Sequence, residues 1–263
     1  MSLVAVVTGA SKGVGKGVAL ALGSAGATVY LTGRTLQGEG SLEVAAREVE
    51  ARGGRAIPVR CDHGVDEDVR ALAKTVAGNH AHVDILVNNV FAAPSGPVFK
   101  TPFWKQPLAM WDTVHQVGLR SHYVASVLLT PLVLKSERGL IANISSFGGA
   151  SYQVNVAYGV GKAGVDRLAR DMAVDLRAHN VCVVSLYPGI VRTERVLAGE
   201  YPFDTSNSES PEFTGRAILA LSADAERMRH SGKVRVVAEL AEEYGFTDVD
   251  GSTPSSLRRK DRS

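Results

Sequence analysis

The chain has few of the features that mark membrane, metal-binding or disulfide-rich proteins. Its 263 residues include only 2 cysteines, Cys61 and Cys182, which lie far apart and lack the spacing of a metal site. No apolar run approaches the ~20 residues that span a bilayer. The best candidate, residues 124–134, is too short and contains Thr130 and Pro131. The sequence therefore predicts no disulfide, no metal centre and no membrane span. With no recognisable signal peptide, we expect a cytoplasmic protein.

The chain also lacks an excess of charge of either sign. It has 29 basic and 27 acidic residues, a formal net charge of +2, which gives no argument for nucleic acid or an anionic membrane as a partner. A composition of 45% hydrophobic and 21% charged residues suits one large α/β domain, with two small domains as the alternative. We expect a single domain over residues 1–250, with substrate loops at 90–108 and 193–211. A solvated, polar and basic tail would follow at residues 251–263.

A glycine-rich turn follows the first apolar stretch. The apolar residues 3–7 end at Thr8, Gly9, Gly13 and Gly15 follow, and the pattern then becomes helical. Glycines let the backbone approach a pyrophosphate, and a helix N-terminus directs free N–H groups at it. Because the turn joins a strand to a helix, it favours a dinucleotide site over the alternative of a tight turn without a ligand.

Strand-like and helical patterns alternate along the rest of the chain. The strands are expected at residues 28–32, 55–61, 83–88, 139–145, 181–186 and 233–239. The helices are expected at residues 41–52, 65–77, 110–134, 157–178 and 211–221. This alternation predicts a doubly wound parallel sheet with helices on both faces. The irregular stretch 90–108, rich in proline and aromatic residues, is expected to form a wall of a substrate pocket, the alternative being an ordinary surface loop.

Polar or conformationally special residues follow most of the expected strands. Ligands in such sheets bind outside the carboxyl ends of the strands. Packing alone does not explain why these positions hold Gly9, Gly33, Arg34, Asp62, Asn88, Asn89, Ser145, Ser146, Pro188 and Gly189.

Tyr158 and Lys162 form the second group with chemical potential. At positions i and i+4 of a helix they share one face. A tyrosine has a pKa near 10, and a neighbouring lysine cation favours the phenolate and lowers that pKa. Tyr158 could then exchange a proton with a carbonyl or alcohol oxygen, and a serine after residue 144 could bond the same oxygen. The pattern indicates hydride transfer coupled to proton transfer, while a solvated surface pair is the alternative.

These motifs together resemble the short-chain dehydrogenase/reductase family. They are TGASKGVG (8–15), CD (61–62), VNN (87–89), NISS (143–146), YGVGK (158–162) and YPGIVRT (187–193). The resemblance implies a Rossmann fold with seven parallel strands, a nicotinamide cofactor, and reduction of ketones or aldehydes. The variants MWDTVHQVGLRSHY, YGVGKAG and PGIVRTE, with EYGFTDVDG near the end, resemble a branch with which steroids and xenobiotic carbonyls are associated.

The resemblance also implies roles for single residues. Tyr158 would be the general acid/base, Lys162 would lower its pKa and bond the nicotinamide ribose, and Ser146, rather than Ser145, would orient the carbonyl. The cofactor phosphates would be wrapped by Gly9, Ser11, Lys12, Gly13, Val14 and Gly15. Asp62 would face the adenine, Asn89 would lie beside the adenosine ribose, and Pro188, Gly189, Val191 and Thr193 would flank the nicotinamide.

The position after the second strand favours NADP(H) over NAD(H). An NAD enzyme has a carboxylate there that holds the ribose 2′-OH, whereas this chain has Thr32, Gly33 and Arg34. A guanidinium matches a phosphate in planar bidentate fashion, and Lys12 could supply a second cation. The alternative is that Arg34 is merely exposed.

One departure from the family pattern concerns proton transfer. The family has asparagine in a V-N-L pattern before the catalytic serine, and this chain has Gly118 there. We expect Gly118 to keep a bend in the helix and a bound water through its main chain, so that proton transfer to Lys162 works without the side chain; the alternative is that the relay is lost and the protein is a weak enzyme or a binder. The rival interpretations are a cofactor-binding redox sensor or scaffold with little catalysis, and a sugar-nucleotide epimerase or dehydratase, which the short C-terminal part disfavours.

Apolar surface expected on residues 124–134 and 157–178 indicates a homodimer or homotetramer.

Overall fold

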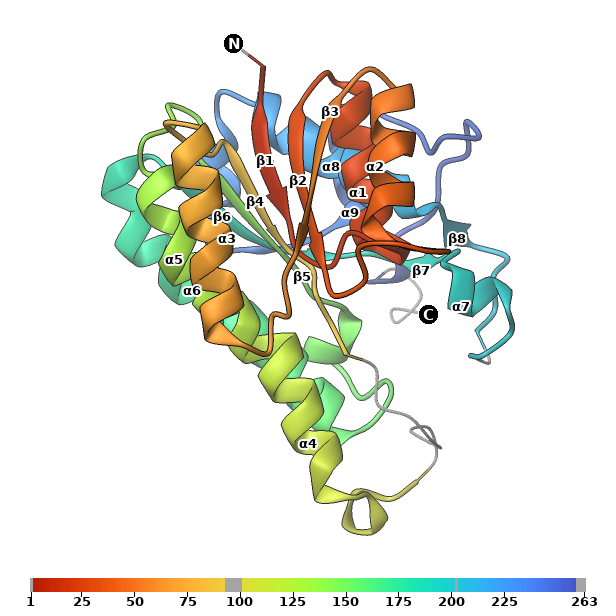
Figure 1. Cartoon of the computed structure of the whole chain (residues 1–263). Coiled ribbons are helices and arrows are strands. Elements are labelled where there is room, and N and C mark those ends of the chain that lie inside the picture. Colours follow the sequence, from red (N-terminus) through yellow and green to blue (C-terminus); the bar gives the residue numbers. More distant parts are fainter. Residues whose placement is uncertain (1, 93–100, 202, 259–263) are drawn as a thin grey trace.

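The computed structural model describes residues 2–92, 101–201 and 203–258. A parallel sheet of seven strands forms its centre, in the order β3-β2-β1-β4-β5-β6-β9 (Figure 1). The strands are β1 (Val4–Val7), β2 (Thr28–Gly33), β3 (Arg55–Arg60), β4 (Ile85–Asn88), β5 (Leu140–Ile144), β6 (Cys182–Tyr187) and β9 (Val234–Val236). This is the predicted doubly wound, Rossmann-type sheet.

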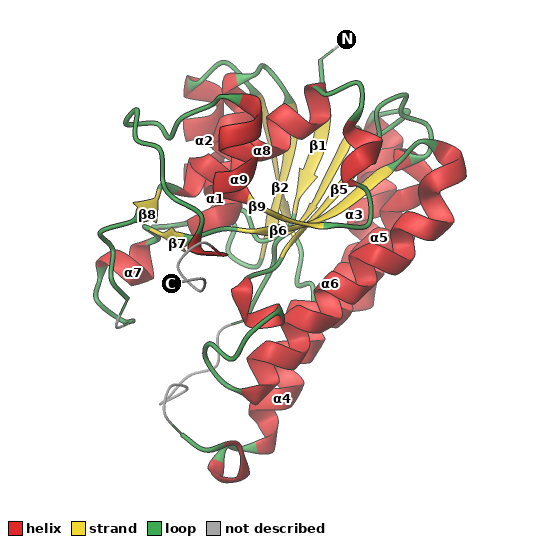
Figure 2. Ribbon diagram, turned by 180° about the vertical axis from the view of Figure 1, so that it is seen from behind, coloured by secondary structure: helices red, strands yellow, loops and turns green. Residues whose placement is uncertain are grey.

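Helices cover both faces of the sheet (Figure 2). One face carries α1 (Gly13–Ser24), α2 (Leu42–Ala51), α8 (Pro211–Ala223) and α9 (Val237–Tyr244). The other carries α3 (Asp66–Asn79), α5 (Ser121–Val133) and α6 (Val156–Leu176). Side chains alternate across β1, so Ala5 and Val7 join the first core while Val4 and Val6 join the second. Both faces of each central strand are therefore buried, which is why these strands are continuously apolar.

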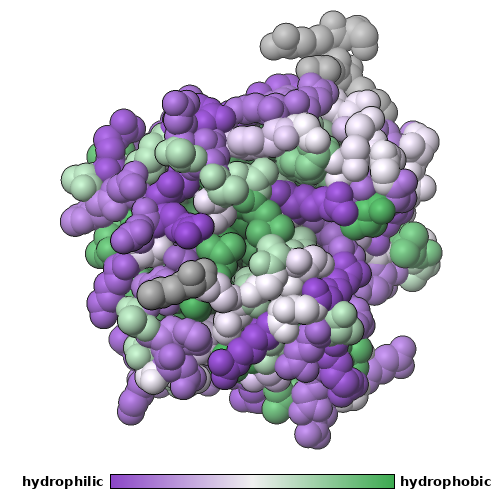
Figure 3. All heavy atoms as spheres, turned by 90° about the horizontal axis from the view of Figure 1, so that it is seen from above, coloured by the Kyte–Doolittle hydropathy of each residue, from purple (hydrophilic) through white to green (hydrophobic). Residues whose placement is uncertain are grey.

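The carboxyl ends of the strands meet at the lower edge of the sheet in Figure 1. The opposite end, seen from above in Figure 3, presents many hydrophilic residues with smaller apolar areas between them. Local capping follows the sequence: Ser41, the expected N-cap of α2, accepts a hydrogen bond from the Val44 N–H at 3.4 Å. Among the described residues, no helix combines the length and the apolar character needed to cross a bilayer.

Two expected elements differ in the structure. The helix expected at 110–134 is divided into α4 (Leu108–His115), a π-helical segment η2 (Gln116–Arg120) and α5. The strand expected at 233–239 ends at Val236, and α9 begins at the next residue. The run of valines there is typical of a strand, but Val237, Ala238, Leu240 and Ala241 are spaced to bury one helical face, and tertiary packing selects the helix.

The two expected substrate loops contain more structure than predicted. In the loop at 193–211, α7 (Glu194–Leu197) is followed by β8 (Ser208–Glu209), which pairs with β7 (Ile190–Val191). In the loop at 90–108, residues 93–100, including Phe99, lie outside the described residues. Phe103 and Trp104 form a short 3-10 turn, η1 (Phe103–Lys105), and are exposed. Phe91 is the aromatic residue of this loop that lines a described pocket.

Candidate active site

The glycine-rich turn between β1 and α1 has no space for side chains at its ends. Gly9 and Gly13 have positive φ angles of 68° and 56°, which disfavour other residues. A Cβ on Gly15 would overlap the Gly9 carbonyl oxygen. Asn89, after β4, donates from Nδ2 to the carbonyls of Thr8 at 2.8 Å and Gly9 at 3.1 Å. The turn is thereby fixed to the sheet, with its main chain open to a ligand.

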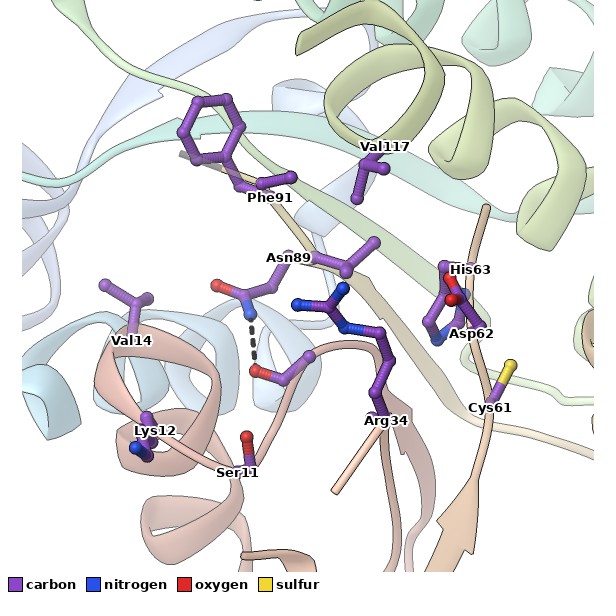
Figure 4. A pocket seen from close by; sticks show the side chains of 14 residues that line it. Ser11, Lys12, Val14, Arg34, Cys61, Asp62, His63, Asn89, Phe91 and Val117 are labelled. Atoms are coloured by element: carbon purple, nitrogen blue, oxygen red, sulfur yellow. Dashed lines mark hydrogen bonds between the residues drawn. The ribbon is translucent and has the colours of Figure 1, made fainter. Parts of the chain in front are cut away.

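A pocket of about 330 Å³ lies in front of this turn (Figure 4). The ends of β1, β2, β3 and β4 line it, as expected for an open α/β sheet. The Arg34 side chain extends from the end of β2 into the pocket, toward Asn89 (Figure 4). Of the predicted cofactor residues, the pocket is lined by Gly9, Ser11, Lys12, Val14, Arg34, Asp62 and Asn89.

The N-terminus of α1 already holds an anionic group. The Gly13 N–H donates to the carboxylate of Glu194, with distances of 3.0 Å to Oε2 and 3.4 Å to Oε1. First-turn N–H groups lack partners within a helix and attract negative charge. The Glu194 carboxylate, at the start of α7, lies where a phosphate oxygen of a bound dinucleotide would be expected. Thr193 lies beside it and caps α7 through the Val196 N–H.

A second cluster is formed by Ser146 and Tyr158. The Tyr158 hydroxyl donates to Ser146 Oγ at 2.8 Å. The backbone fixes both residues: Ser146 Oγ accepts from the Gly148 N–H at 3.1 Å, and Asn155 caps α6 by accepting from the Tyr158 N–H at 2.9 Å. Ser145 instead faces away, with its hydroxyl donating to the Lys162 carbonyl at 3.2 Å. The structure thus brings Ser146, not Ser145, to the phenol.

Lys162 lies one helical turn after Tyr158, and it is 7% exposed. Its Nζ donates to the Ile144 carbonyl at 3.0 Å and lies 5.9 Å from the centre of the Tyr158 ring. Burial lowers the pKa of Lys162 to about 8, against a smaller opposing effect of Asp166. The net pKa of Tyr158 is raised in this arrangement. Burial raises that pKa, and the hydrogen bond with Ser146 offsets the rise only in part.

Gly118 lies within the π-helical segment, and the ring of Phe91 packs against it. A Cβ on Gly118 would come within 2.9 Å of Phe91 Cδ2. The same ring packs edge-on to Tyr158, at 5.8 Å between centroids, and faces Lys162 Nζ at 5.2 Å. The expected irregularity of the helix at Gly118 is confirmed, and π segments are frequent at functional sites. The sequence did not indicate that Phe91 packs between Gly118 and Tyr158, because no local pattern around residue 91 predicts contact with these distant segments.

A pocket of about 170 Å³ opens on the other side of Tyr158. Ser146, Tyr158, Pro188 and Gly189 line it together with mainly apolar residues. These others are Phe147, Gly148, Gln153, Val154, Ile190, Val191, Phe203 and Leu257. Leu257 comes from residues 252–258, which run back over the domain. The side chain of Asn207 bonds both the N–H and the carbonyl of Ser255, at 2.9 and 3.0 Å, and Ser256 Oγ donates to Glu239 at 2.8 Å. The predicted tail therefore contributes a wall of this pocket, while residues 259–263 lie outside the described residues.

Glu209 is a buried carboxyl group that the sequence did not reveal. It is 1% exposed, and its Oε2 lies 3.0 Å from where a Gly189 Cβ would be. Burial raises the pKa of Glu209 to about 8, although the Gly189 N–H favours the charged form. A carboxyl group therefore lies directly behind the Pro188–Gly189 turn.

The fold and these motifs define a nicotinamide-dependent oxidoreductase of the Rossmann type. The family model described as short chain dehydrogenase matches residues 3–198, and the chain belongs to this family. It is 43% identical to dehydrogenase/reductase SDR family member 1 of Mus musculus over 264 residues. This aligned region covers 94% of this chain and 83% of that protein. The predicted family and branch are thereby confirmed.

More distant relatives differ in substrate and cofactor. The chain is 32% identical over 191 residues to 7alpha-hydroxysteroid dehydrogenase of Escherichia coli K12, covering 72% of this chain and 71% of that protein. A short chain dehydrogenase of Shigella flexneri complexed with NADP has a TM-score of 0.78 at 26% identity, covering 89% and 96% of the two chains. A 3-oxoacyl-[acyl-carrier protein] reductase of Brucella melitensis with bound NAD shares the fold, with a TM-score of 0.78 at 24% identity over 89% of each chain.

Proposed function

We propose that this protein is an NADP(H)-dependent reductase of apolar ketones or aldehydes, with Ser146, Tyr158 and Lys162 as its catalytic residues. The observation that carries the proposal is the hydrogen bond of 2.8 Å between the Tyr158 and Ser146 hydroxyls, beside an apolar pocket. A module that only binds a nucleotide has no need of this pair. The rival function, a redox sensor or scaffold with little catalysis, lacks a role for it.

The cofactor, when bound, supplies the hydride; the protein supplies position and protons. Ser146 holds the carbonyl oxygen of the substrate by donating a hydrogen bond. Tyr158 gives its proton to the same oxygen as negative charge develops there. Lys162 places a positive charge one helical turn away, which favours the phenolate that remains. The glycine turn and the first turn of α1 would hold the phosphates of the cofactor; the Gly13 N–H already binds an anionic carboxylate, that of Glu194, which a phosphate would displace.

The preference for NADP(H) rests on Arg34. Its guanidinium extends into the cofactor pocket from the end of β2, where an NAD enzyme has a carboxylate. Fluorescence titration with NADPH and NADH tests this: NADPH should bind much more tightly, and Arg34→Asp should abolish the preference. Arg47→Asp, an equal charge change at an exposed position of α2, should leave it intact. Equal affinities in the wild type would refute the cofactor assignment.

The substrate class follows from the second pocket. Its mainly apolar lining favours a hydrophobic carbonyl compound. The similarity to a hydroxysteroid dehydrogenase supports steroid-like ketones as the first compounds to test. A panel of apolar and polar ketones and aldehydes, scored by loss of NADPH absorbance, separates the two proposals. Turnover of no member of the panel, together with tight NADPH binding, would favour the sensor or scaffold.

We also propose that the protein is a homodimer or homotetramer. α5 and α6 expose Tyr123, Val127 and Val174, with 56%, 51% and 67% of their surfaces accessible. Apolar side chains on adjacent helices of one face suit burial against a second copy. Light scattering at micromolar concentration should show more than one chain per particle, and a monomer would refute this.

A further inference from the structure

Lys162 is a buried cation without a close anionic partner. Its ammonium donates to the Ile144 carbonyl, and it forms no ion pair with the described residues. A buried ammonium tends to lose its proton, because burial disfavours the charged form. The proposed role of Lys162 nevertheless requires the charge. The surroundings of Lys162 must therefore contain a group that stabilises it.

The Phe91 ring faces the ammonium at 5.2 Å, and Asp166 is the group placed to supply a negative charge. It follows Lys162 by one turn of α6, so the two side chains lie on one face of the helix. Its carboxylate accepts a hydrogen bond from Ser185 Oγ at 2.5 Å and another from the Tyr187 hydroxyl. Both donors lie on β6. Burial raises the pKa of Asp166, whereas these two bonds, a hydrogen bond with Ser145 and the charge of Lys162 favour the ionised carboxylate. The negative charge is thus fixed between the helix and the sheet, one turn behind the catalytic pair.

The segment after Ser146 closes over this pair. A Cβ on Gly149 would overlap Asp166 Oδ2 and would lie 3.1 Å from the main-chain carbon of Lys162. The carboxylate is therefore covered by main chain and is partly shielded from water. Charges in such surroundings interact more strongly than charges in solvent. Asp166 can act on Lys162 without touching it.

The other titratable groups near Lys162 carry no negative charge near neutral pH. His122 on α5 faces Lys162, and burial lowers the pKa of His122 to about 3, so its imidazole is neutral. Burial raises the pKa values of Tyr158 and Tyr187, which keeps both phenols protonated. Arg258 acts on Tyr187 as a distant positive charge. Among the described groups that act on Lys162, Asp166 supplies the negative charge.

We propose that Asp166 is a positioning residue whose carboxylate, fixed by Ser185 and Tyr187, keeps Lys162 protonated beside Tyr158. The inference rests on the proposed roles of Lys162 and Tyr158. It assigns a function to a residue outside the family motifs described above. It also explains why two hydroxyl groups from β6 converge on a single side chain of α6.

The test measures the titration of Lys162 directly, without turnover. In protein labelled with ¹³C at the lysine ε-carbons, the Lys162 resonance is the one that Lys162→Met removes. Asp166→Asn should lower its midpoint by about one pH unit, a tenfold fall in the ratio of charged to neutral amine. The matched control is Asp171→Asn, because Asp171 lies on the same helix but is exposed and paired with Arg167. An unchanged midpoint in Asp166→Asn would overturn the proposal.

A second measurement covers the case in which Asp166→Asn does not fold. The interaction between two charges is the same whichever partner is titrated, so Lys162→Met must raise the midpoint of the Asp166 carboxyl by the same amount. ¹³C-carboxyl labelling of aspartate measures it, with Asp171 as the internal reference. If neither the Lys162 midpoint nor the Asp166 midpoint changes in these variants, this proposal is refuted and the proposed carbonyl reduction is unaffected. Absence of turnover with shifted midpoints refutes the proposed function alone.

Discussion

Because Glu194 is hydrogen-bonded to the start of α1, we predict that a Glu194 variant binds NADPH more tightly than the wild type does. The Glu194 carboxylate accepts from the Gly13 N–H at 3.0 Å, which is the donor that the cofactor phosphates are expected to use. Cofactor binding must break this bond. A hydrogen bond to a charged group contributes about 1.5–3 kcal/mol when buried. This one is exposed, which reduces it to about 1 kcal/mol. Glu194→Gln should therefore bind NADPH about fivefold more tightly.

Fluorescence titration with NADPH measures this gain in affinity. The dependence of the gain on salt concentration shows whether it is electrostatic. The gain should be largest at low ionic strength, because part of it comes from removing a negative charge beside the phosphates. Glu200→Gln is the matched control: Glu200 lies near the end of the same segment, but it pairs with Arg195 at 2.6 Å instead of with α1. Equal or weaker binding by Glu194→Gln would show that the carboxylate does not compete with the cofactor.

Four further outcomes are expected. Tyr158→Phe should abolish carbonyl reduction and leave NADPH affinity nearly unchanged, since only the proton donor is lost; wild-type turnover would contradict its role. Leu257→Ala should improve kcat/KM for bulkier apolar ketones, measured on a size series, and an unchanged series would remove Leu257 from the pocket wall. Gly118→Asn should lower turnover through its clash with Phe91, and Phe91→Ala should relieve that loss in the double variant; additive losses would argue against the clash. Burial lowers the pKa of Lys162 from 10.5 to about 8, so the unfolded chain binds more protons between these values. In urea unfolding, the wild type should therefore gain stability relative to Lys162→Met as the pH rises from about 8 to about 10.

The sequence predicted the sheet and the glycine-rich turn because both depend on local signals. Apolar runs that end in glycine or polar residues define the strands, and the turn glycines have backbone angles or contacts that exclude side chains. The boundary between β9 and α9 could not be predicted in this way. Valines around β9 favour a strand locally, and only the packed core shows that α9 begins at Val237.

Contacts between distant segments account for the other omissions. Phe91 meets Gly118, Asn207 meets Ser255, and Glu209 lies behind Gly189, although no local pattern connects the segments. The raised pKa of Tyr158 could not be predicted for a related reason. Spacing along a helix shows that Lys162 is near, but it shows neither the direction of the ammonium nor the degree of burial.

The double hydrogen bond between Asn207 and Ser255 has a consequence for the time course of turnover. These residues are 48 positions apart, yet each is held by the other, and they lie close in sequence to Phe203 and Leu257, which line the apolar pocket. A displacement of one segment relative to the other at this point would break both bonds, so we expect the segments around Phe203 and Leu257 to move together. Where release of a product requires that movement, changes to these two bonds would alter the rate of release without altering the chemical step.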